Sequence, residues 1–291
     1  MRTRAELPTL TDRLPLGTSG LEVSPICLGI TQDPRTIPAA FEAGINFFFL
    51  TADMHWPAYE ATRRGLAQLI ASRPEARDAI VVGAASYVAQ PEFLWVPFQE
   101  VVRELPGIER LDLTIAGGSY GHEIDRRLET YERHRRVGHV GARAIGASFH
   151  DREAALRIVE QGALDIAFVR YSPCFPKARD DLFPHVTSRA DGRRTLLFNF
   201  KSTYGHIATE AEYAALGIGA DYWRPHPTDY YRFALTEPAI DGILCALDGP
   251  DMVAELADAL AKGPLDEDDQ QYLLDLGELV RGTARVDPAS P

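Results

Sequence analysis

The stretch of sequence that decides the fold is Gly44-Ile45-Asn46-Phe47-Phe48-Phe49-Leu50-Thr51-Ala52-Asp53-Met54-His55-Trp56. Its first half, Ile45 to Leu50, is almost uninterrupted apolar, which is typical of a parallel strand covered on both faces. Its second half is a loop that carries Asp53 and His55. In α/β proteins, polar residues at the carboxyl ends of strands form the functional site. The stretch therefore predicts a buried strand followed by a loop that carries functional side chains.

The composition indicates an acidic globular protein. With 291 residues, of which 45% are hydrophobic, the chain can bury one large core. A net charge of −12 argues against nucleic acid and anionic membrane surfaces as partners. No apolar run approaches the about 20 residues that span a bilayer, and residues 1–6 lack the apolar segment of a secretory signal. Three widely spaced cysteines argue against a disulfide framework. We therefore expect a cytoplasmic location, and the sequence indicates no oligomeric state.

Apolar runs and amphipathic segments alternate along the chain. The runs predicted as strands are 21–30, 45–50, 78–83, 111–116, 142–147, 164–171, 195–200 and 240–246. The segments predicted as helices are 38–43, 59–72, 93–105, 124–137, 152–161, 180–189, 226–235, 250–262 and 266–280. Asp151 is expected to cap one of these helices, and residues from about 283 are expected to form a flexible tail.

This alternation predicts an α/β protein with a (β/α)8 TIM barrel in one domain, residues 1–291. The alternative is an open, doubly wound sheet. The sequence has no Gly-x-Gly-x-x-Gly after the first strand and no phosphate-binding P-loop, so dinucleotide binding of the Rossmann kind has no support.

Four segments carry a resemblance to a known family. They are Leu16-Gly17-Thr18-Ser19-Gly20-Leu21-Glu22-Val23-Ser24-Pro25-Ile26-Cys27-Leu28-Gly29, then Gly44 to Phe48, Arg143-Ala144-Ile145-Gly146-Ala147-Ser148, and Pro264-Leu265-Asp266-Glu267-Asp268. In this order and at this spacing the chain resembles the aldo-keto reductases over nearly its whole length. The resemblance implies a (β/α)8 barrel and reduction of a carbonyl group by hydride transfer from NADPH.

The residues that the family uses for this chemistry are replaced. Its reductases use a tyrosine as proton donor, with a lysine, an aspartate and a histidine around it. Matched one at a time, the aspartate falls on Leu50, the tyrosine on His55, the lysine on Ala85 and the histidine on Gly117.

The positions that the resemblance implies for the cofactor also differ. The asparagine and glutamine that hold the nicotinamide amide fall on Phe149 and Phe168. The basic residue that holds the 2′-phosphate falls on Asp248, and a carboxylate repels a phosphate. We interpret the chain as a divergent member that has lost NADPH-dependent reduction, so no cofactor is favoured. NADP(H)-dependent reduction with a non-standard site is the runner-up.

Polar residues follow most of the predicted strands and are expected at the mouth of the barrel. The candidate catalytic residues are His55, His150, Lys201 and Asp53. The candidate substrate-binding residues are Trp56, Tyr120, His122, Glu123, Phe149, Phe168, Arg170, Tyr171, Cys174 and Tyr204.

Three hypotheses fit this set besides the reductase. In the favoured one, histidine and lysine perform acid–base chemistry on a small organic metabolite, as a lyase, isomerase, dehydratase or cyclase does, and a role in specialised biosynthesis is expected. In the second, His55, His122, Glu123 and His150 bind a divalent metal, although no tight ligand spacing supports it. In the third, the barrel binds a ligand or a protein partner without catalysis. Cys174 is a further candidate, as a nucleophile with His150.

Overall fold

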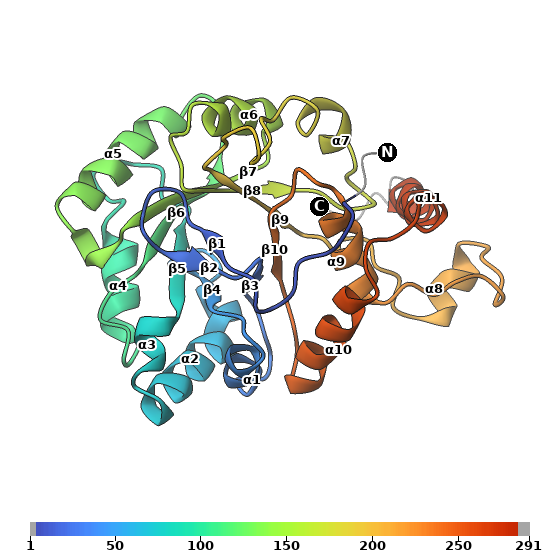
Figure 1. Ribbon diagram of the computed structural model, residues 1–291, viewed down its shortest axis with the longest axis horizontal. Helices are drawn as coiled ribbons and strands as arrows, with labels where there is room; N and C mark the ends of the chain where they lie inside the picture. The colour runs from blue at the N-terminus through green and yellow to red at the C-terminus, as the bar shows by residue number, and fades with distance from the viewer. Residues whose placement is uncertain (1–3, 285–291) are drawn as a thin grey trace.

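The computed structural model describes residues 4–284 and contains the predicted barrel. Eight parallel strands close in the order β10-β3-β4-β5-β6-β7-β8-β9, with helices around them (Figure 1). The strands are β3 (Ile26–Leu28), β4 (Phe47–Thr51), β5 (Val81–Ser86), β6 (Leu113–Ser119), β7 (Ala144–Phe149), β8 (Ile166–Arg170), β9 (Leu196–Phe200) and β10 (Gly242–Cys245). All eight predicted strand segments overlap an observed strand, but β4, β5, β6 and β7 start and end later than predicted.

The helices follow the predicted order. They are α1 (Thr36–Glu42), α2 (Glu60–Ser72), α3 (Ala76–Ala79), α4 (Val96–Glu104), α5 (Ile124–Arg136), α6 (Arg152–Glu160), α7 (Ala178–Asp181), α8 (Glu210–Ala215), α9 (Pro227–Thr236), α10 (Pro250–Ala261) and α11 (Glu267–Ala284). The predicted cap is confirmed, because the Asp151 carboxylate accepts the Ala154 N–H at 3.1 Å. Two short 3₁₀ helices also occur, η1 (Trp56–Tyr59) and η2 (His139–Gly141). No helix of the described residues is long and apolar enough to cross a membrane.

Three predictions about helices need correction. The helix predicted over 180–189 is wrong, because α7 ends at Asp181 and Pro184 cannot continue it. Helices α3 and α8 were not predicted. The last helix, predicted to end at 280, continues to Ala284, and the rest of the predicted tail, residues 285–291, lies outside the described residues. That residues 1–291 form a single domain stays a prediction.

An antiparallel hairpin, β1 (Leu14–Pro15) and β2 (Glu22–Val23), lies at the N-terminal end of the barrel. The turn of the hairpin contacts Asp165, which precedes β8. Thr18 donates its N–H to the Asp165 carboxylate at 3.0 Å. Gly17 has a φ of +55°, and a Cβ there would lie 2.1 Å from the same carboxylate. The hairpin is therefore fixed at this end, which leaves the opposite end of the barrel for a site.

A short polar side chain precedes every second strand of the barrel. These residues are Asn46 before β4, Asp112 before β6, Asp165 before β8 and Asp241 before β10. Each accepts a backbone N–H from the preceding strand segment, and the donors are Ser24 at 2.6 Å, Val82 at 2.8 Å, Ile145 at 2.9 Å and Leu197 at 2.8 Å. An arginine also pairs with each aspartate: Arg77 with Asp112, Arg135 with Asp165, and Arg193 with Asp241. These contacts fix neighbouring strands to each other at the N-terminal end.

Phenylalanines fill the inside of the barrel. Phe47 and Phe168 each pack edge-on against Phe198, with ring centroids 5.8 and 5.9 Å apart. Phe49 packs against Phe168 at 5.7 Å, closer to the carboxyl ends of the strands. Edge-to-face packing at these distances is favourable. This layer closes the barrel interior and gives the site above it an apolar floor.

Candidate functional site

A cavity of about 950 Å³ opens at the carboxyl ends of the strands, and we call it the C-terminal cavity. Its wall comes from the loops after β3 to β7, β9 and β10, and Phe49 and Phe168 form part of its floor. It is lined by Gly29, Ile30, Phe49, Met54, His55, Ala58, Tyr59, Tyr87, Ala89, Gly117, Gly118, Tyr120, His122, Glu123, Arg127, Ser148, His150, Phe168, Phe200, Lys201, Ser202, Thr203, Tyr231, Leu244, Cys245 and Ala246. The size and the position suit a small organic ligand.

About half of the predicted site residues line this cavity. They are His55, Tyr120, His122, Glu123, His150, Phe168 and Lys201. The other predicted residues are not part of its wall: Asp53, Trp56, Phe149, Arg170, Tyr171, Cys174 and Tyr204.

Asp53 is held by the loop after β5. Its carboxylate accepts the Ser86 hydroxyl at 2.6 Å and the Tyr87 N–H at 2.9 Å. It also accepts the Met54 N–H at 2.6 Å. Asp53 therefore orients Tyr87, and its carboxylate lies behind the wall, so the predicted catalytic role finds no support in its contacts.

Cys174 does not have the environment of a nucleophile. The thiol is fully buried, and its Sγ contacts the Gly277 carbonyl at 3.4 Å. Burial raises the pKa of Cys174 to about 11. A thiol with such a pKa stays protonated at neutral pH, and the thiolate is the reactive form. The prediction that Cys174 attacks a substrate with His150 is therefore corrected to a packing role.

The remaining predicted residues do not line the cavity and contact other side chains instead. Tyr171 stacks on Phe233 at 5.2 Å, Tyr204 contacts Phe175 at 4.9 Å, and the Arg63 guanidinium lies 3.7 Å from the centre of the Trp56 ring. Phe149 is buried on the outer face of β7, because the alternation of the strand places Ser148 and His150 in the cavity. Strand alternation also directs Arg170 inward, but its guanidinium lies 4.0 Å from the centre of the Phe175 ring, and neither residue lines the cavity.

His150 lies beside two cations. Its ring packs edge-on against Phe200, with the centroids 5.5 Å apart. Burial lowers the pKa of His150, and the positive charges of Arg170 and Lys201 lower it further. The imidazole is therefore neutral at pH 7 and is available as a base.

His55 shares its side of the cavity with two tyrosines that the sequence analysis missed. The His55 ring meets Tyr87 edge-on at 5.4 Å, and Tyr59 packs against Phe49 at 6.0 Å. Burial raises the pKa of Tyr59, with smaller contributions from Tyr87 and Cys27, so its phenol is protonated at neutral pH. Tyr87 directly follows β5, so the rule that found the other strand-end residues could have found it. Tyr59 stands at the first position of a predicted helix, where no such signal exists.

Arg127 is the third residue that was missed. Its side chain is 1% exposed, and its guanidinium donates to the carbonyls of Ser86 and Gly117, both at 2.9 Å. It also pairs with the Glu123 carboxylate at 3.2 Å. Arg127 thus links the ends of β5 and β6 and holds Glu123 at the cavity wall. From sequence this i,i+4 pair in a charged helix is typical of a solvated surface.

The described residues offer no metal centre. Across residues 4–284, no group of three or more His, Cys, Asp or Glu side chains is placed to hold a metal ion. His122, one of the predicted ligands, stacks on Tyr120 with the ring centroids 6.2 Å apart. The metal hypothesis therefore has no ligand set in this part of the chain.

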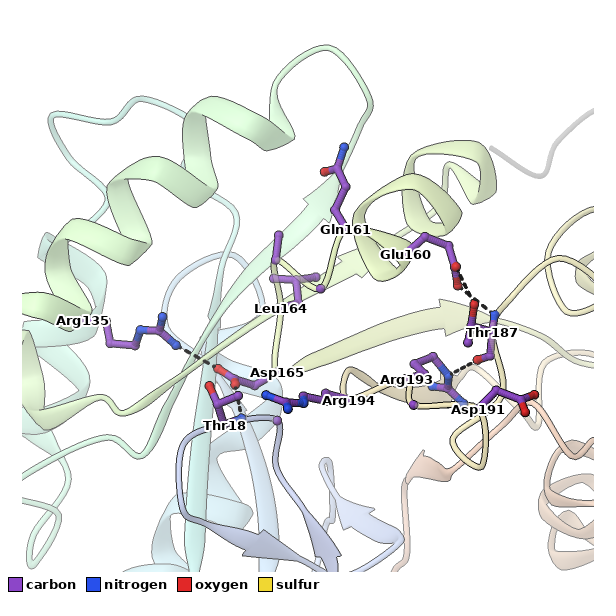
Figure 2. A pocket seen from close by; sticks show the side chains of 14 residues that line it. Thr18, Arg135, Glu160, Gln161, Leu164, Asp165, Thr187, Asp191, Arg193 and Arg194 are labelled. Carbon is purple, nitrogen blue, oxygen red and sulfur yellow. Dashed lines mark hydrogen bonds and ion pairs between the residues drawn. The ribbon is translucent and has the colours of Figure 1, made fainter.

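A second hollow, of about 370 Å³, lies at the N-terminal end of the barrel (Figure 2). Several of its charged groups bind neighbouring residues: Asp165 binds Arg135 and the Thr18 N–H, and Glu160 binds Thr187. Arg193 donates to the Thr187 carbonyl and pairs with Asp241. These groups hold the hairpin and the strand starts, so we assign this hollow to stability.

Comparison with solved structures identifies the architecture. The structure matches the aldo-keto reductase AKR11C1 from Bacillus halodurans in its holo form, with a TM-score of 0.68 and 15% identity over 91% of this chain and 96% of that one. The fold is that of the aldo-keto reductases. Another match is MGS-M4, an aldo-keto reductase from a Medee basin deep-sea metagenome library, with a TM-score of 0.63, 15% identity and coverage of 91% and 94%.

A third match is PA4992, an aldo-keto reductase candidate from Pseudomonas aeruginosa, with a TM-score of 0.62 and 19% identity over 88% of this chain and 97% of that chain. No protein-family model matches the sequence, and no curated protein matches it. Identities this low establish the shared fold, and function must be argued from the site.

Proposed function

We propose that this aldo-keto reductase fold carries an enzyme that performs acid–base chemistry on a small organic metabolite without a redox cofactor. One observation carries the proposal: the imidazoles of His55, His122 and His150 and the phenols of Tyr59 and Tyr87 open into one cavity with an apolar floor. Imidazole exchanges protons near neutral pH, whereas burial raises the pKa of Tyr59 and makes its phenol a weak acid that is suited to hydrogen bonding.

The residues present do not fit NADP(H). At the start of α10, Asp248 stands where the resemblance implies a basic residue, and its carboxylate accepts the Gln32 N–H at 2.7 Å. The Gly249 N–H is donated to the Thr36 hydroxyl at 2.8 Å. Asp251 adds a second carboxylate to the first turn of the same helix. Carboxylates and an occupied N–H do not favour a phosphate.

The positions that the resemblance implies around the proton-donor tyrosine also argue against NADP(H)-dependent reduction. Leu50 and Ala85, where the resemblance implies an aspartate and a lysine, are buried and apolar at the ends of β4 and β5. Gly117, where a histidine is implied, lines the cavity with Tyr87 packed against it. No ionisable pair at these positions can therefore lower the pKa of a tyrosine, and we route no step through a nicotinamide.

The roles of the residues follow from their positions. His150, which is neutral, takes a proton from the substrate. His55, on the other side of the cavity, returns one, and Tyr87 packs against the His55 ring. Such a pair serves isomerisation, loss of water and other lyase-type reactions. The acid–base role of Lys201 stays a prediction.

The second candidate function is NADP(H)-dependent carbonyl reduction with a non-standard site. It is favoured by the match to the holo form of AKR11C1 over 91% of this chain. This argument is an analogy between folds, whereas the first proposal rests on the cavity.

Proton exchange in D₂O tests the proposal. The protein is incubated without cofactor with a panel of enolisable ketones and 2-oxo acids, and deuterium incorporation is followed by NMR. We expect exchange that His150→Gln abolishes and that the control His185→Gln, at an exposed histidine, leaves intact. Turnover that requires NADPH would favour the second candidate, and a cavity that binds members of the panel without exchange would favour a non-catalytic binding protein.

A further inference from the structure

Two cations follow or end adjacent strands at the C-terminal end of the barrel: Lys201 lines the C-terminal cavity, and Arg170 lies outside its lining. The register pairs Phe149 of β7 with Val169 of β8, so the next residues, His150 and Arg170, are neighbours. The register of β8 and β9 pairs Arg170 with Phe200, and Lys201 comes next. Arg170 and Lys201, which we call the cation pair, therefore lie at adjacent strand ends, and the charges of both act on His150.

Neither cation is paired with a carboxylate in the described part of the chain. No ion pair among residues 4–284 includes Arg170 or Lys201, whereas the nearby Arg152 binds Asp181 through two contacts of 2.6 Å. The Arg170 guanidinium stacks on Phe175, an arrangement that leaves its N–H groups free to donate in the plane of the group. In a chain with 42 acidic and 30 basic residues, cations without carboxylates beside a cavity indicate an anionic ligand.

Lys201 adopts a strained backbone conformation. Its φ is +59°, a left-handed value that only one other non-glycine residue of the described chain, Val140, shares. The Asn199 amide holds the strand end by donating to the Tyr171 carbonyl at 2.5 Å and to the Phe200 carbonyl at 3.2 Å, and Ser202 donates to Asn199. Strain of this kind persists where the surroundings enforce it, and it clusters at functional sites.

Aromatic residues precede the cation pair on β8 and β9. Phe168 precedes Arg170 by two residues on the same face of β8, and Phe200 precedes Lys201. Both rings line the cavity, and Phe49 continues this surface at 5.7 Å from Phe168. A ligand that fills this half of the cavity therefore has an apolar or aromatic body and a negative end.

We propose that Arg170 and Lys201 bind the carboxylate of an organic acid whose apolar body lies on Phe168 and Phe200. That this acid is the substrate rests on the proposed function, but its binding does not. A carboxylate here forms charge-assisted hydrogen bonds with both cations. The carboxylate also offsets the positive charge beside His150, so binding of the ligand should make the His150 imidazole a stronger base.

A matched pair of ligands tests this site on the whole chain. Benzoate and benzamide have the same ring and nearly the same shape, but only benzoate is charged. We measure the affinity of each by calorimetry and follow the His150 imidazole by NMR. We expect benzoate to bind at least about tenfold more tightly than benzamide and to raise the pKa of His150. Equal affinities for the two ligands would overturn the proposal.

Two lysine variants test whether the preference for benzoate over benzamide depends on Lys201. Lys201→Gly removes the cation and suits the left-handed backbone, so the variant is expected to fold. It should remove most of the preference for benzoate, whereas Lys262→Ala, at an exposed lysine that ends α10, should keep it. An unchanged preference in Lys201→Gly would contradict the assignment of the cation pair.

Phosphate-bearing ligands separate a metabolite site from a nucleotide site. If NADPH displaces benzoate, binds more tightly than benzoate and loses affinity in Lys201→Gly, the cation pair binds a nucleotide phosphate and the proposal is overturned. If no deuterium exchange is found but benzoate binds as expected, only the proposed function is overturned. The two proposals can therefore fail separately.

Discussion

At the scale of single residues, the chemistry of the cavity depends on what surrounds each titratable group. His150 lies beside Arg170 and Lys201, and burial together with these charges lowers its pKa. Cys174 is enclosed by its own loop and by Gly277, and burial raises its pKa to about 11. Burial therefore favours the neutral form of both groups: an imidazole that can accept a proton at His150, and a thiol that stays protonated at Cys174.

Removing one cation should make His150 easier to protonate. Arg170→Gln deletes a positive charge that disfavours the imidazolium, so the pKa of His150 rises toward its ordinary value. As a consequence, the neutral base of the variant is lost at a higher pH than in the parent. An NMR titration of the His150 ring measures this, and an unchanged or lower pKa in the variant would show that Arg170 does not act on His150.

Thiol labelling tests the correction of Cys174. Cys27, Cys174 and Cys245 are all buried. The native protein should react negligibly with Ellman's reagent, and the denatured protein should release three equivalents, one for each cysteine of the sequence. Rapid modification of Cys174 in the native protein, identified by mass spectrometry, would restore it as a candidate nucleophile.

At the scale of elements, the strands are positioned by side chains at their starts. The sequences Ile45-Asn46-Phe47, Leu111-Asp112-Leu113, Leu164-Asp165-Ile166 and Ile240-Asp241-Gly242 repeat one pattern, an aliphatic residue followed by Asn or Asp just before a strand. Asp241 shows what the pattern does: its carboxylate accepts the Leu197 N–H of the neighbouring strand and pairs with the buried Arg193, both at 2.8 Å.

Truncation of such an aspartate should be costly. Asp241→Ala leaves the Arg193 charge and the Leu197 N–H buried without this acceptor, and we expect a loss of about 3–5 kcal/mol in the free energy of unfolding. Asp241→Asn, which retains an acceptor as Asn46 does before β4, should lose less. Urea denaturation of the three proteins checks the order, and a loss below about 1 kcal/mol for the alanine variant would contradict the role.

Glycine at position 201 should relieve the backbone strain directly after β9. Lys201 has a φ of +59°, so Lys201→Gly removes the left-handed strain and should stabilise the protein by about 1 kcal/mol. Lys262→Gly is the control, because Lys262 has a helical φ of −68° and glycine there costs stability instead. Thermal unfolding compares the two variants. A less stable Lys201→Gly protein would mean that the lysine side chain contributes to the fold and not only to the cavity.

At the scale of the whole molecule, the barrel was predictable because its strands are continuous apolar runs such as Phe47 to Leu50. The positions of strand ends followed from them, and His55, His150 and Lys201 do line one cavity. The direction of each side chain did not follow. Asp53 turns to Ser86, and Arg127 reaches from a helix that looks solvated to the carbonyls of Ser86 and Gly117. Such contacts depend on the packing of several elements, and no local pattern encodes them.

The central claim is that this aldo-keto reductase fold works without a nicotinamide cofactor. Titration of the purified protein with NADPH, followed by nucleotide fluorescence, tests the claim most directly. The resemblance implies the 2′-phosphate at Asp248, and Asp251 adds a second carboxylate to the first turn of α10, so we predict no saturable binding below about millimolar concentrations. A dissociation constant in the micromolar range would contradict the account.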